Sequence, residues 1–182
     1  MGVYDFEKVN GFIRQGLDVL LFEDLWSLYI FNESDMHSAA YYYIRKFMEK
    51  KGRDDAYVRC EPMILGSKPD IVIYKNSDPL YIIELKMFSR PDQLDERGVL
   101  MDLAKMADIM EKTPSIRWGF FLMIYDHEEP FNPSPYTMRK SGFDRLSITS
   151  INARRHKKTD RLRSGYKEWR QDFDKITIAH KL

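Results

Sequence analysis

The sequence predicts an α/β fold in which a mixed central sheet of four or five strands is flanked by helices. Two apolar segments joined by a short polar loop, residues 71–74 and 80–83, have the pattern of a β-hairpin. The continuous apolar run at 117–125 is typical of a central strand that is covered on both faces. Helical spacing of apolar residues precedes and follows the hairpin, at 33–51 and 94–112.

The first 31 residues predict one or two helices ahead of this region. Apolar side chains from Leu17 to Tyr29 recur near the spacing of a helix face. The sequence leaves three roles open for this segment: covering the sheet, extending a binding surface, or forming a contact between two copies of the chain.

The next helix is defined by its ends and by one face. Asn32 has the side chain of an N-cap with Asp35 at the third helical position, and Gly52 is a plausible stop signal. Glu33 begins a stripe expected to pack on the sheet, whereas Glu49 falls on the outward side. Favourable placement of an acid near the helix dipole is the alternative interpretation of Glu33. The stripe consists of Glu33, His37, Ala40, Ile44 and Met48.

The register of the hairpin places its first charged residue. After an expected strand at 56–60, a hairpin loop that closes at Lys75 and Leu80 sets Asp70 opposite about Leu85. Asp70 would then face the same side as Leu85, away from the neighbouring charges. The prediction of a common site therefore requires a bulge or a one-residue shift near Asp70.

Three charged side chains converge at this end of an otherwise apolar hairpin. Strand alternation puts Glu84 and Lys86 on one face, and the register brings Asp70 within a residue of both. Burying an ionised carboxylate is costly unless it is paired or holds a metal ion. Two carboxylates and one ammonium therefore suggest a cation site, with a hairpin end exposed to solvent as the alternative.

These residues form a motif with a defined spacing: Pro69-Asp70, followed after fourteen residues by Glu84-Leu85-Lys86. Each half recurs elsewhere, in Pro91-Asp92 and in Glu49-Lys50-Lys51, but neither copy lies in a predicted strand. Only residues 69–86 combine the order, the spacing and the strand, turn, strand context. In this combination the chain resembles the PD-(D/E)XK nuclease superfamily, the restriction-endonuclease-like group.

The resemblance covers roughly residues 32–126 and implies both a restriction-endonuclease-like fold and a reaction. The family hydrolyses phosphodiester bonds, usually in DNA, with one or two bound Mg²⁺ ions. The implied cofactor is Mg²⁺ or Mn²⁺, and the implied partner is nucleic acid, with DNA as the expected substrate. By motif position, the metal-binding and catalytic roles fall to Asp70, Glu84, the Leu85 carbonyl, Lys86, which orients the attacking water, and Glu33.

Four further residues are secondary candidates, each with a plainer interpretation. His37 is either a ligand or a histidine that is hydrogen-bonded in the core. Lys68, which adjoins the motif, is either a phosphate contact or a solvated turn lysine. Asp102 and Lys105 lie three residues apart on the helix at 94–112, where they either border the site or form an intrahelical ion pair.

The C-terminal region is the basic end of the chain. Between Arg154 and Arg170, eight Lys or Arg residues stand against two acids, a net charge of +6, whereas the whole chain carries +1. Such residues can neutralise phosphates, and a solvated final helix at 159–173 is the alternative. An edge strand is expected at 144–151, and the acidic cluster at 126–129 has the pattern of a loop start. The candidate nucleic-acid contacts are Arg154, Arg155, Lys157, Lys158, Arg161, Arg163 and Lys167.

Length and composition fit one domain. A chain of 182 residues with 43% hydrophobic residues can bury one substantial core. We expect an N-terminal helical extension at 1–31, a catalytic core at 32–126 and a basic C-terminal region at 127–182. No targeting pattern or membrane-spanning run is recognisable, so we expect a cytoplasmic protein without membrane contact. The single cysteine, Cys60, excludes an internal disulfide and a multi-cysteine zinc site.

The sequence thus predicts a metal-dependent nuclease. Two alternatives stay open: a non-catalytic nucleic-acid-binding subunit with the same fold, and an interaction domain whose charges form structural ion pairs. The motif does not choose between DNA and RNA or between endonuclease and exonuclease. It is equally silent about a homodimer, a common state among such enzymes.

Overall fold

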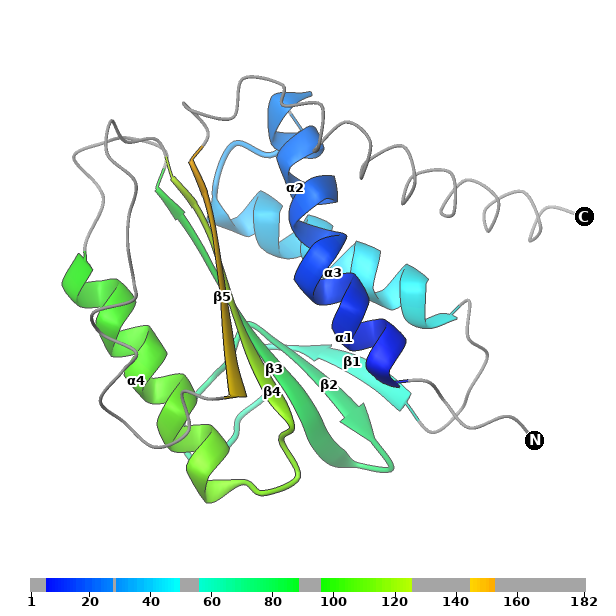
Figure 1. Cartoon of the computed structure of the whole chain (residues 1–182), viewed down its shortest axis with the longest axis vertical. Helices are drawn as coiled ribbons and strands as arrows, with labels where there is room; N and C mark the ends of the chain where they lie inside the picture. The colour runs from blue at the N-terminus through cyan, green and yellow to red at the C-terminus, as the bar shows by residue number, and fades with distance from the viewer. Residues whose placement is uncertain (1–5, 28, 50–55, 89–95, 126–144, 153–182) are drawn as a thin grey trace, which may run out of the picture.

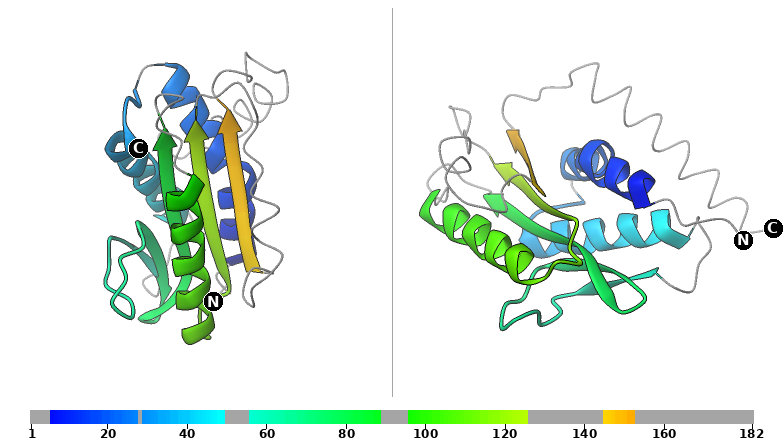
Figure 2. Two further views of the ribbon diagram at one scale, coloured as in Figure 1. Left: turned by 90° about the vertical axis from the view of Figure 1, so that its left-hand side faces the viewer. Right: turned by 60° about the horizontal axis from the view of Figure 1, so that its bottom comes forward.

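A computed structural model describes residues 6–27, 29–49, 56–88, 96–125 and 145–152 of the chain (Figure 1). It contains one five-stranded open sheet with helices on both faces, as the sequence predicts. Three helices, α1, α2 and α3, lie against one face, and α4 lies against the other (Figure 2). The elements are α1 (Phe6–Gln15), α2 (Leu17–Trp26), α3 (Glu33–Glu49), β1 (Ala56–Cys60), β2 (Ile71–Lys75), β3 (Asp78–Phe88), α4 (Glu96–Lys112), β4 (Trp118–Tyr125) and β5 (Leu146–Asn152).

The sheet is mixed, with the strands in the order β1-β2-β3-β4-β5. Neighbouring strands from β1 to β3 are antiparallel, and β3, β4 and β5 are parallel to one another. Strand β4 is buried over almost its whole length between β3 and β5, which confirms the prediction of a central strand there. Strand β5 forms one edge of the sheet, also as predicted.

The β2–β3 hairpin is tighter than the sequence analysis assumed. Lys75 pairs with Asp78, so the turn consists of Asn76 and Ser77 alone. Both have positive φ, 49° and 75°, as a two-residue type I′ turn requires. The register shifts by one residue between Ile73 and Tyr74. The predicted irregularity is therefore present, but it lies beside the turn and not near Asp70 as we expected.

This shift decides which way Asp70 faces. Ile71, the first residue of β2, pairs with Ile83, so Asp70 precedes the strand at the level of Glu84. The predicted pairing of Asp70 with Leu85 was wrong by one residue. The correction places Asp70 beside Glu84 without a further bulge, because the extra residue of β3 has already been absorbed near the hairpin turn.

Each face of the sheet has its own apolar core, and β3 contributes alternate residues to both. Tyr81, Ile83 and Leu85 pack with the three N-terminal helices, whereas Ile82 and Phe88 pack with α4. Helices α1 and α2 thus cover one face of the sheet, which is the first of the three roles that the sequence left open. The buried residues of α4 agree with the helical spacing predicted for 94–112 and include Val99, Leu103, Met106, Ala107 and Met110.

Helix α3 begins where its capping residue predicts. The N–H of Asp35 donates to Asn32 Oδ1 at 3.0 Å, and the Asp35 carboxylate accepts from the N–H of Phe31 at 3.0 Å. On its outward side, Glu49 pairs with Arg45 at 2.9 Å, in agreement with the predicted orientation. This cap fixes the first turn of α3, and with it Glu33, next to the end of β3.

Several predictions fall outside the described residues. They concern the Gly52 helix stop, the second copy of the Pro-Asp half-motif, the acidic cluster at 126–129, the helix at 159–173 and the basic residues from Arg154 to Lys167. Among the helices that the structure describes, none is long and apolar enough to cross a membrane.

Candidate active site

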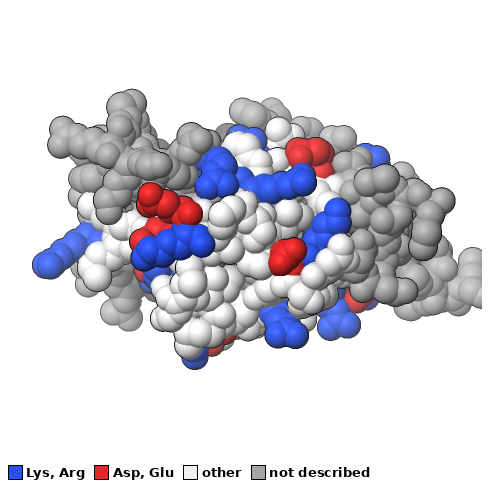
Figure 3. All heavy atoms as spheres, turned by 90° about the horizontal axis from the view of Figure 1, so that it is seen from below, with Lys and Arg blue, Asp and Glu red and all other residues white. Residues whose placement is uncertain are grey.

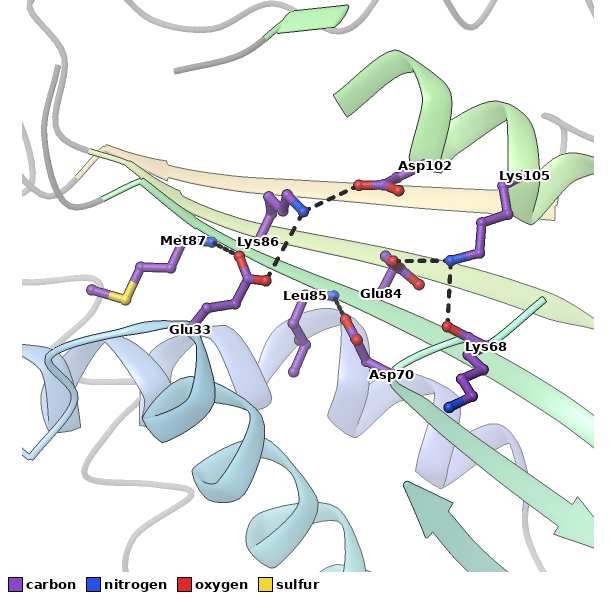
Figure 4. A network of polar contacts seen from close by, with 9 residues as sticks. All are labelled: Glu33, Lys68, Asp70, Glu84, Leu85, Lys86, Met87, Asp102 and Lys105. Atoms are coloured by element: carbon purple, nitrogen blue, oxygen red, sulfur yellow. Dashed lines mark hydrogen bonds and ion pairs between the residues drawn. The ribbon is translucent and has the colours of Figure 1, made fainter. Parts of the chain in front are cut away.

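The candidate site begins where strand β3 continues past its neighbour. Strand β2 starts at Ile71 opposite Ile83, so within the described residues Glu84–Phe88 pair along only one edge, with β4. Two N–H groups of β3 beyond this point bond to carboxylates (Figure 4). The Leu85 N–H donates to Asp70 Oδ2 at 2.7 Å. The Met87 N–H donates to Glu33 Oε2 at 3.1 Å. The carboxylates of two other segments therefore satisfy donors that β2 leaves unpaired.

Glu84 is the centre of this arrangement and the only buried charged residue in the described part of the chain, at 6% exposure. Burial, followed by repulsion from Asp70, raises the pKa of Glu84 to about 7, although Lys105 pulls it down. Its Oε1 lies 3.5 Å from Lys105 Nζ. Its Oε2 is buried and has no hydrogen-bond partner in the structure. Glu84 is thus an acid with one oxygen available to a ligand.

Asp70 shares the electrostatic environment of Glu84. Burial raises the pKa of the Asp70 carboxyl, an effect that the hydrogen bond from the Leu85 N–H opposes. The charge of Glu33 raises the pKa of Asp70 further, whereas those of His37 and Lys105 lower it. Carboxyl groups whose pKa is raised by burial and by a neighbouring acid are a favourable environment for a cation.

Lys86 lies two residues after Glu84, on the same face of β3, between carboxylates from two helices. Its Nζ is 3.4 Å from Asp102 Oδ2 and 3.9 Å from Glu33 Oε1. Burial alone lowers the pKa of Lys86, but the attraction of Glu33 and Asp102 outweighs it, so the pKa is raised. Lys86 therefore carries its proton and can donate hydrogen bonds.

Both secondary candidates on α4 border the site, although the sequence allowed a simpler role for them. The predicted alternative was an ion pair between Asp102 and Lys105. In the structure Asp102 instead contacts Lys86, while Lys105 contacts Glu84 and donates to the Lys68 carbonyl oxygen at 3.3 Å. Lys68 thus contributes its backbone, and Figure 4 shows its side chain pointing away from Glu84.

His37 supports the segment that carries Asp70. Its Nε2 lies 2.8 Å from the Asp70 carbonyl oxygen and must be the donor, because a carbonyl only accepts. The N–H of Glu61 donates to the same oxygen at 2.9 Å. Of the two roles that the sequence left open, the structure shows the hydrogen-bonded one, in which His37 links α3 to the start of β2.

The side chains present fit a hard divalent ion that needs few protein ligands. Within the described residues no group of three or more His, Cys, Asp or Glu is arranged to hold a metal ion. Mg²⁺ is commonly bound through one or two carboxylates, with waters and substrate oxygens completing its shell. Asp70 and Glu84 meet that requirement, and the unpartnered Oε2 of Glu84 is a suitable oxygen. Glu33 lies apart from them, toward Lys86 and Met87, and a part for the Leu85 carbonyl stays a prediction.

The described residues on one face of the molecule carry charges of both signs (Figure 3). On the face shown in Figure 3, Lys and Arg side chains are interspersed with Asp and Glu side chains. Contacts to a phosphate backbone therefore stay a prediction for the basic residues from Arg154 to Lys167, which the structure does not describe.

Comparisons of this chain with known protein families, with curated proteins and with solved structures found no match. The function must therefore be argued from the motif and from the geometry of the site. The strongest geometric fact is that acidic groups from α3, from the start of β2 and from β3 gather with two lysines at one end of β3.

Proposed function

We propose that this chain is a metal-dependent nuclease, with a site of the PD-(D/E)XK type on a restriction-endonuclease-like fold. It would hydrolyse phosphodiester bonds in nucleic acid, with DNA as the expected substrate. One observation carries the proposal: Asp70, Glu84 and Lys86 lie at the same end of β3, where Asp70 accepts from the N–H of the residue after Glu84.

The residues divide the chemistry among them. Asp70 and Glu84 would hold Mg²⁺ or Mn²⁺, which supplies charge stabilisation at the scissile phosphate and lowers the pKa of a water. Lys86, kept protonated by Asp102 and Glu33, is suited to orient a water or a phosphate oxygen by donating hydrogen bonds. A lysine that keeps its proton is a poor general base, so we assign Lys86 to positioning and charge stabilisation.

A cleavage assay with matched variants tests this proposal. Purified protein is incubated with Mg²⁺ or Mn²⁺ at low salt and a panel of labelled DNA and RNA: single strands, duplexes and junctions. We expect Asp70→Asn, Glu84→Gln and Lys86→Met each to reduce cleavage by about a hundredfold or more, since each removes a charge that acts on the reacting phosphate. Asp70→Asn keeps an oxygen that can accept from the Leu85 N–H.

The control lies in the same hairpin. Asp78→Asn changes an exposed aspartate at the turn end of β3, far along the strand from Glu84, and should cleave like the wild type. Cleavage by Asp70→Asn and Glu84→Gln at the wild-type rate would contradict the proposed site.

A specific observation keeps one alternative in view. Every charged group at the site contacts an opposite charge or a backbone group, which is also what a structural ion-pair network would show. Calorimetric titration with Mn²⁺ separates the two, because a structural network should bind no Mn²⁺. In the proposed nuclease, binding is present in the wild type and lost in Glu84→Gln. A protein that binds nucleic acid in a salt-sensitive way without binding Mn²⁺ would be the non-catalytic subunit.

A further inference from the structure

A buried carboxylate at the end of β3 needs a cation, and the metal-free protein supplies one from α4. Lys105 Nζ lies between Glu84 Oε1 at 3.5 Å and the Lys68 carbonyl oxygen at 3.3 Å (Figure 4). Its contacts are thus oxygens of β3 and of the segment that leads to Asp70. Hard oxygens of this kind are also the atoms that a divalent ion prefers.

The contacts of Lys105 are weak enough to exchange. Both distances lie beyond the usual hydrogen-bond range of about 2.7–3.2 Å for nitrogen donors. The side chain of Lys105 is 31% exposed, against 8% for that of Glu84. The lysine therefore has a route to solvent along its flexible stem, whereas Glu84 must stay in place and keep a positive partner.

Lys86 is not a second cation of the same kind. Its ammonium lies between Asp102 and Glu33, so it has two carboxylate partners other than Glu84. On α4, Asp102 contacts Lys86 and Lys105 contacts Glu84. Each of these α4 side chains therefore contacts a residue of β3 with the opposite charge. Only Lys105 forms an ion pair with the proposed metal ligand Glu84 in the described part of the chain.

We propose that Lys105 is the resident counter-cation of Glu84: it holds this carboxylate in the metal-free protein and gives up the contact when a divalent ion binds. The inference rests on the proposed function, because it takes Glu84 to be a metal ligand. It assigns α4 a regulatory part, since the affinity for the metal ion then includes the free energy of separating Lys105 from Glu84. A divalent ion and an ammonium group on one carboxylate repel each other, so one displaces the other.

Chemical labelling of the wild-type protein tests the exchange directly. Lysines are acylated briefly with an N-hydroxysuccinimide ester, in EDTA or in saturating Mn²⁺, and quantified by mass spectrometry of peptides. We expect Mn²⁺ to raise the labelling of Lys105 several-fold, because the amine loses Glu84 and gains solvent. Lys112 is the internal control: it lies on the same helix, pairs with Asp108 at 2.8 Å on the surface, and should be labelled equally in both conditions.

The outcomes separate this inference from the proposed function. If calorimetry shows Mn²⁺ binding while the labelling of Lys105 stays unchanged or falls, the counter-cation role is wrong and the metal site stands. If the wild-type protein binds no Mn²⁺, both the metal site and the exchange are wrong.

A variant gives an independent readout that does not depend on catalysis. Lys105→Met keeps the stem and removes the charge, and Lys112→Met is its matched control. The titration is run at pH 8.5, where a proton competes less with the metal ion for a carboxylate than it does at neutral pH. There we expect Lys105→Met to bind Mn²⁺ about tenfold more tightly than the wild type, the factor for removing a competing charge of moderate strength. An affinity equal to or weaker than that of the wild type and of Lys112→Met would overturn the inference.

Discussion

The two halves of strand β3 have the same backbone conformation but opposite environments. Residues Tyr81–Ile83 are fully buried and pair with both β2 and β4. Residues Glu84–Phe88 keep β4 on one edge, whereas β2 is absent from the other and carboxylates bond to the strand in its place. The buried charge of β3, Glu84, therefore lies just beyond the point where its neighbour β2 begins.

The difference follows from the accounting of backbone hydrogen bonds. In the first half both edges of the strand are hydrogen-bonded to a neighbouring strand, so no side chain is needed as an acceptor for the backbone N–H groups. In the second half the N–H groups of Leu85 and Met87 need other acceptors, and Asp70 and Glu33 supply them. Asp70 also raises the pKa of the neighbouring Glu84, and the ammonium group of Lys105 on α4 opposes this effect. The late start of β2 therefore leaves an edge of β3 unpaired, and the side chains that bond to this edge also form the candidate site.

The largest expected effect lies in the first half of the strand. Ile83 is fully buried among the α1–α3 core residues. Ile83→Ala should lower the free energy of unfolding by about 2–5 kcal/mol, through lost burial and the cavity left behind. Urea denaturation measures this loss, with Asp78→Asn as an exposed control on the same strand. A loss below about 1 kcal/mol would mean that this half is less tightly packed than its burial indicates.

Replacement of Glu84, the next residue of β3, should instead raise the stability of the fold at pH 8. The pKa of Glu84 is about 7 in the folded protein and 4.5 in the ordinary reference state, so the folded state binds the proton more tightly. Its protonation stabilises the fold fully below about pH 4.5, and this contribution of about 3 kcal/mol is lost as the pH rises to about 7. In EDTA, Glu84→Gln should therefore remove this fall in stability and be the more stable protein at pH 8.

Thermal or urea unfolding across this pH range in EDTA checks the prediction. The same variant should lose Mn²⁺ binding, so that a gain in stability accompanies a loss of the site. A wild-type stability that rises over this pH window and matches that of Glu84→Gln would show that Glu84 is not held in an unfavourable charged state.

The sequence was most informative where local rules determine the structure. Alternation along β3 correctly separated Glu84 from Leu85, the Asn32 cap correctly started α3, and the apolar run ending at Tyr125 correctly predicted a buried strand. These features depend on residues that are close in sequence.

The features that the sequence missed depend on distant elements. The place of the register shift depends on the type I′ turn at Asn76 and Ser77, which was assumed to be longer. The contacts of Asp102 and Lys105 with β3 depend on how α4 crosses the sheet, and their spacing also fits an intrahelical pair. A signal was nevertheless present: both pairs have the acid before the lysine. A helix that runs antiparallel to β3 then brings each of its charges to the opposite charge of the strand.

Replacing Asp70 separates its two roles in the second half of the strand. Asp70→Ala leaves the Leu85 N–H without its acceptor and should lower the free energy of unfolding by about 1–3 kcal/mol. Asp70→Asn keeps an acceptor and should stay within about 1 kcal/mol of the wild type while cleavage is lost. Urea denaturation in EDTA, measured beside the cleavage assay, compares them. Equal stability of the two variants would mean that the hydrogen bond to Leu85 contributes little.

The smallest effect is expected at Glu33, which accepts a hydrogen bond from the Met87 N–H. Its side chain is 48% exposed and lies 3.9 Å from Lys86, and an ion pair so open to solvent contributes at most about 1 kcal/mol. Glu33→Gln keeps an acceptor for the Met87 N–H, so its stability should match that of the wild type. Glu33→Ala removes the acceptor and should be slightly less stable than the wild type. Because Glu33 contacts Lys86 and Met87 and lies apart from Glu84, we expect Glu33→Gln to reduce cleavage less than Glu84→Gln does. A loss of cleavage and of Mn²⁺ affinity as large as that of Glu84→Gln would instead make Glu33 a metal ligand, and the site would then extend from the β2 start to the first turn of α3.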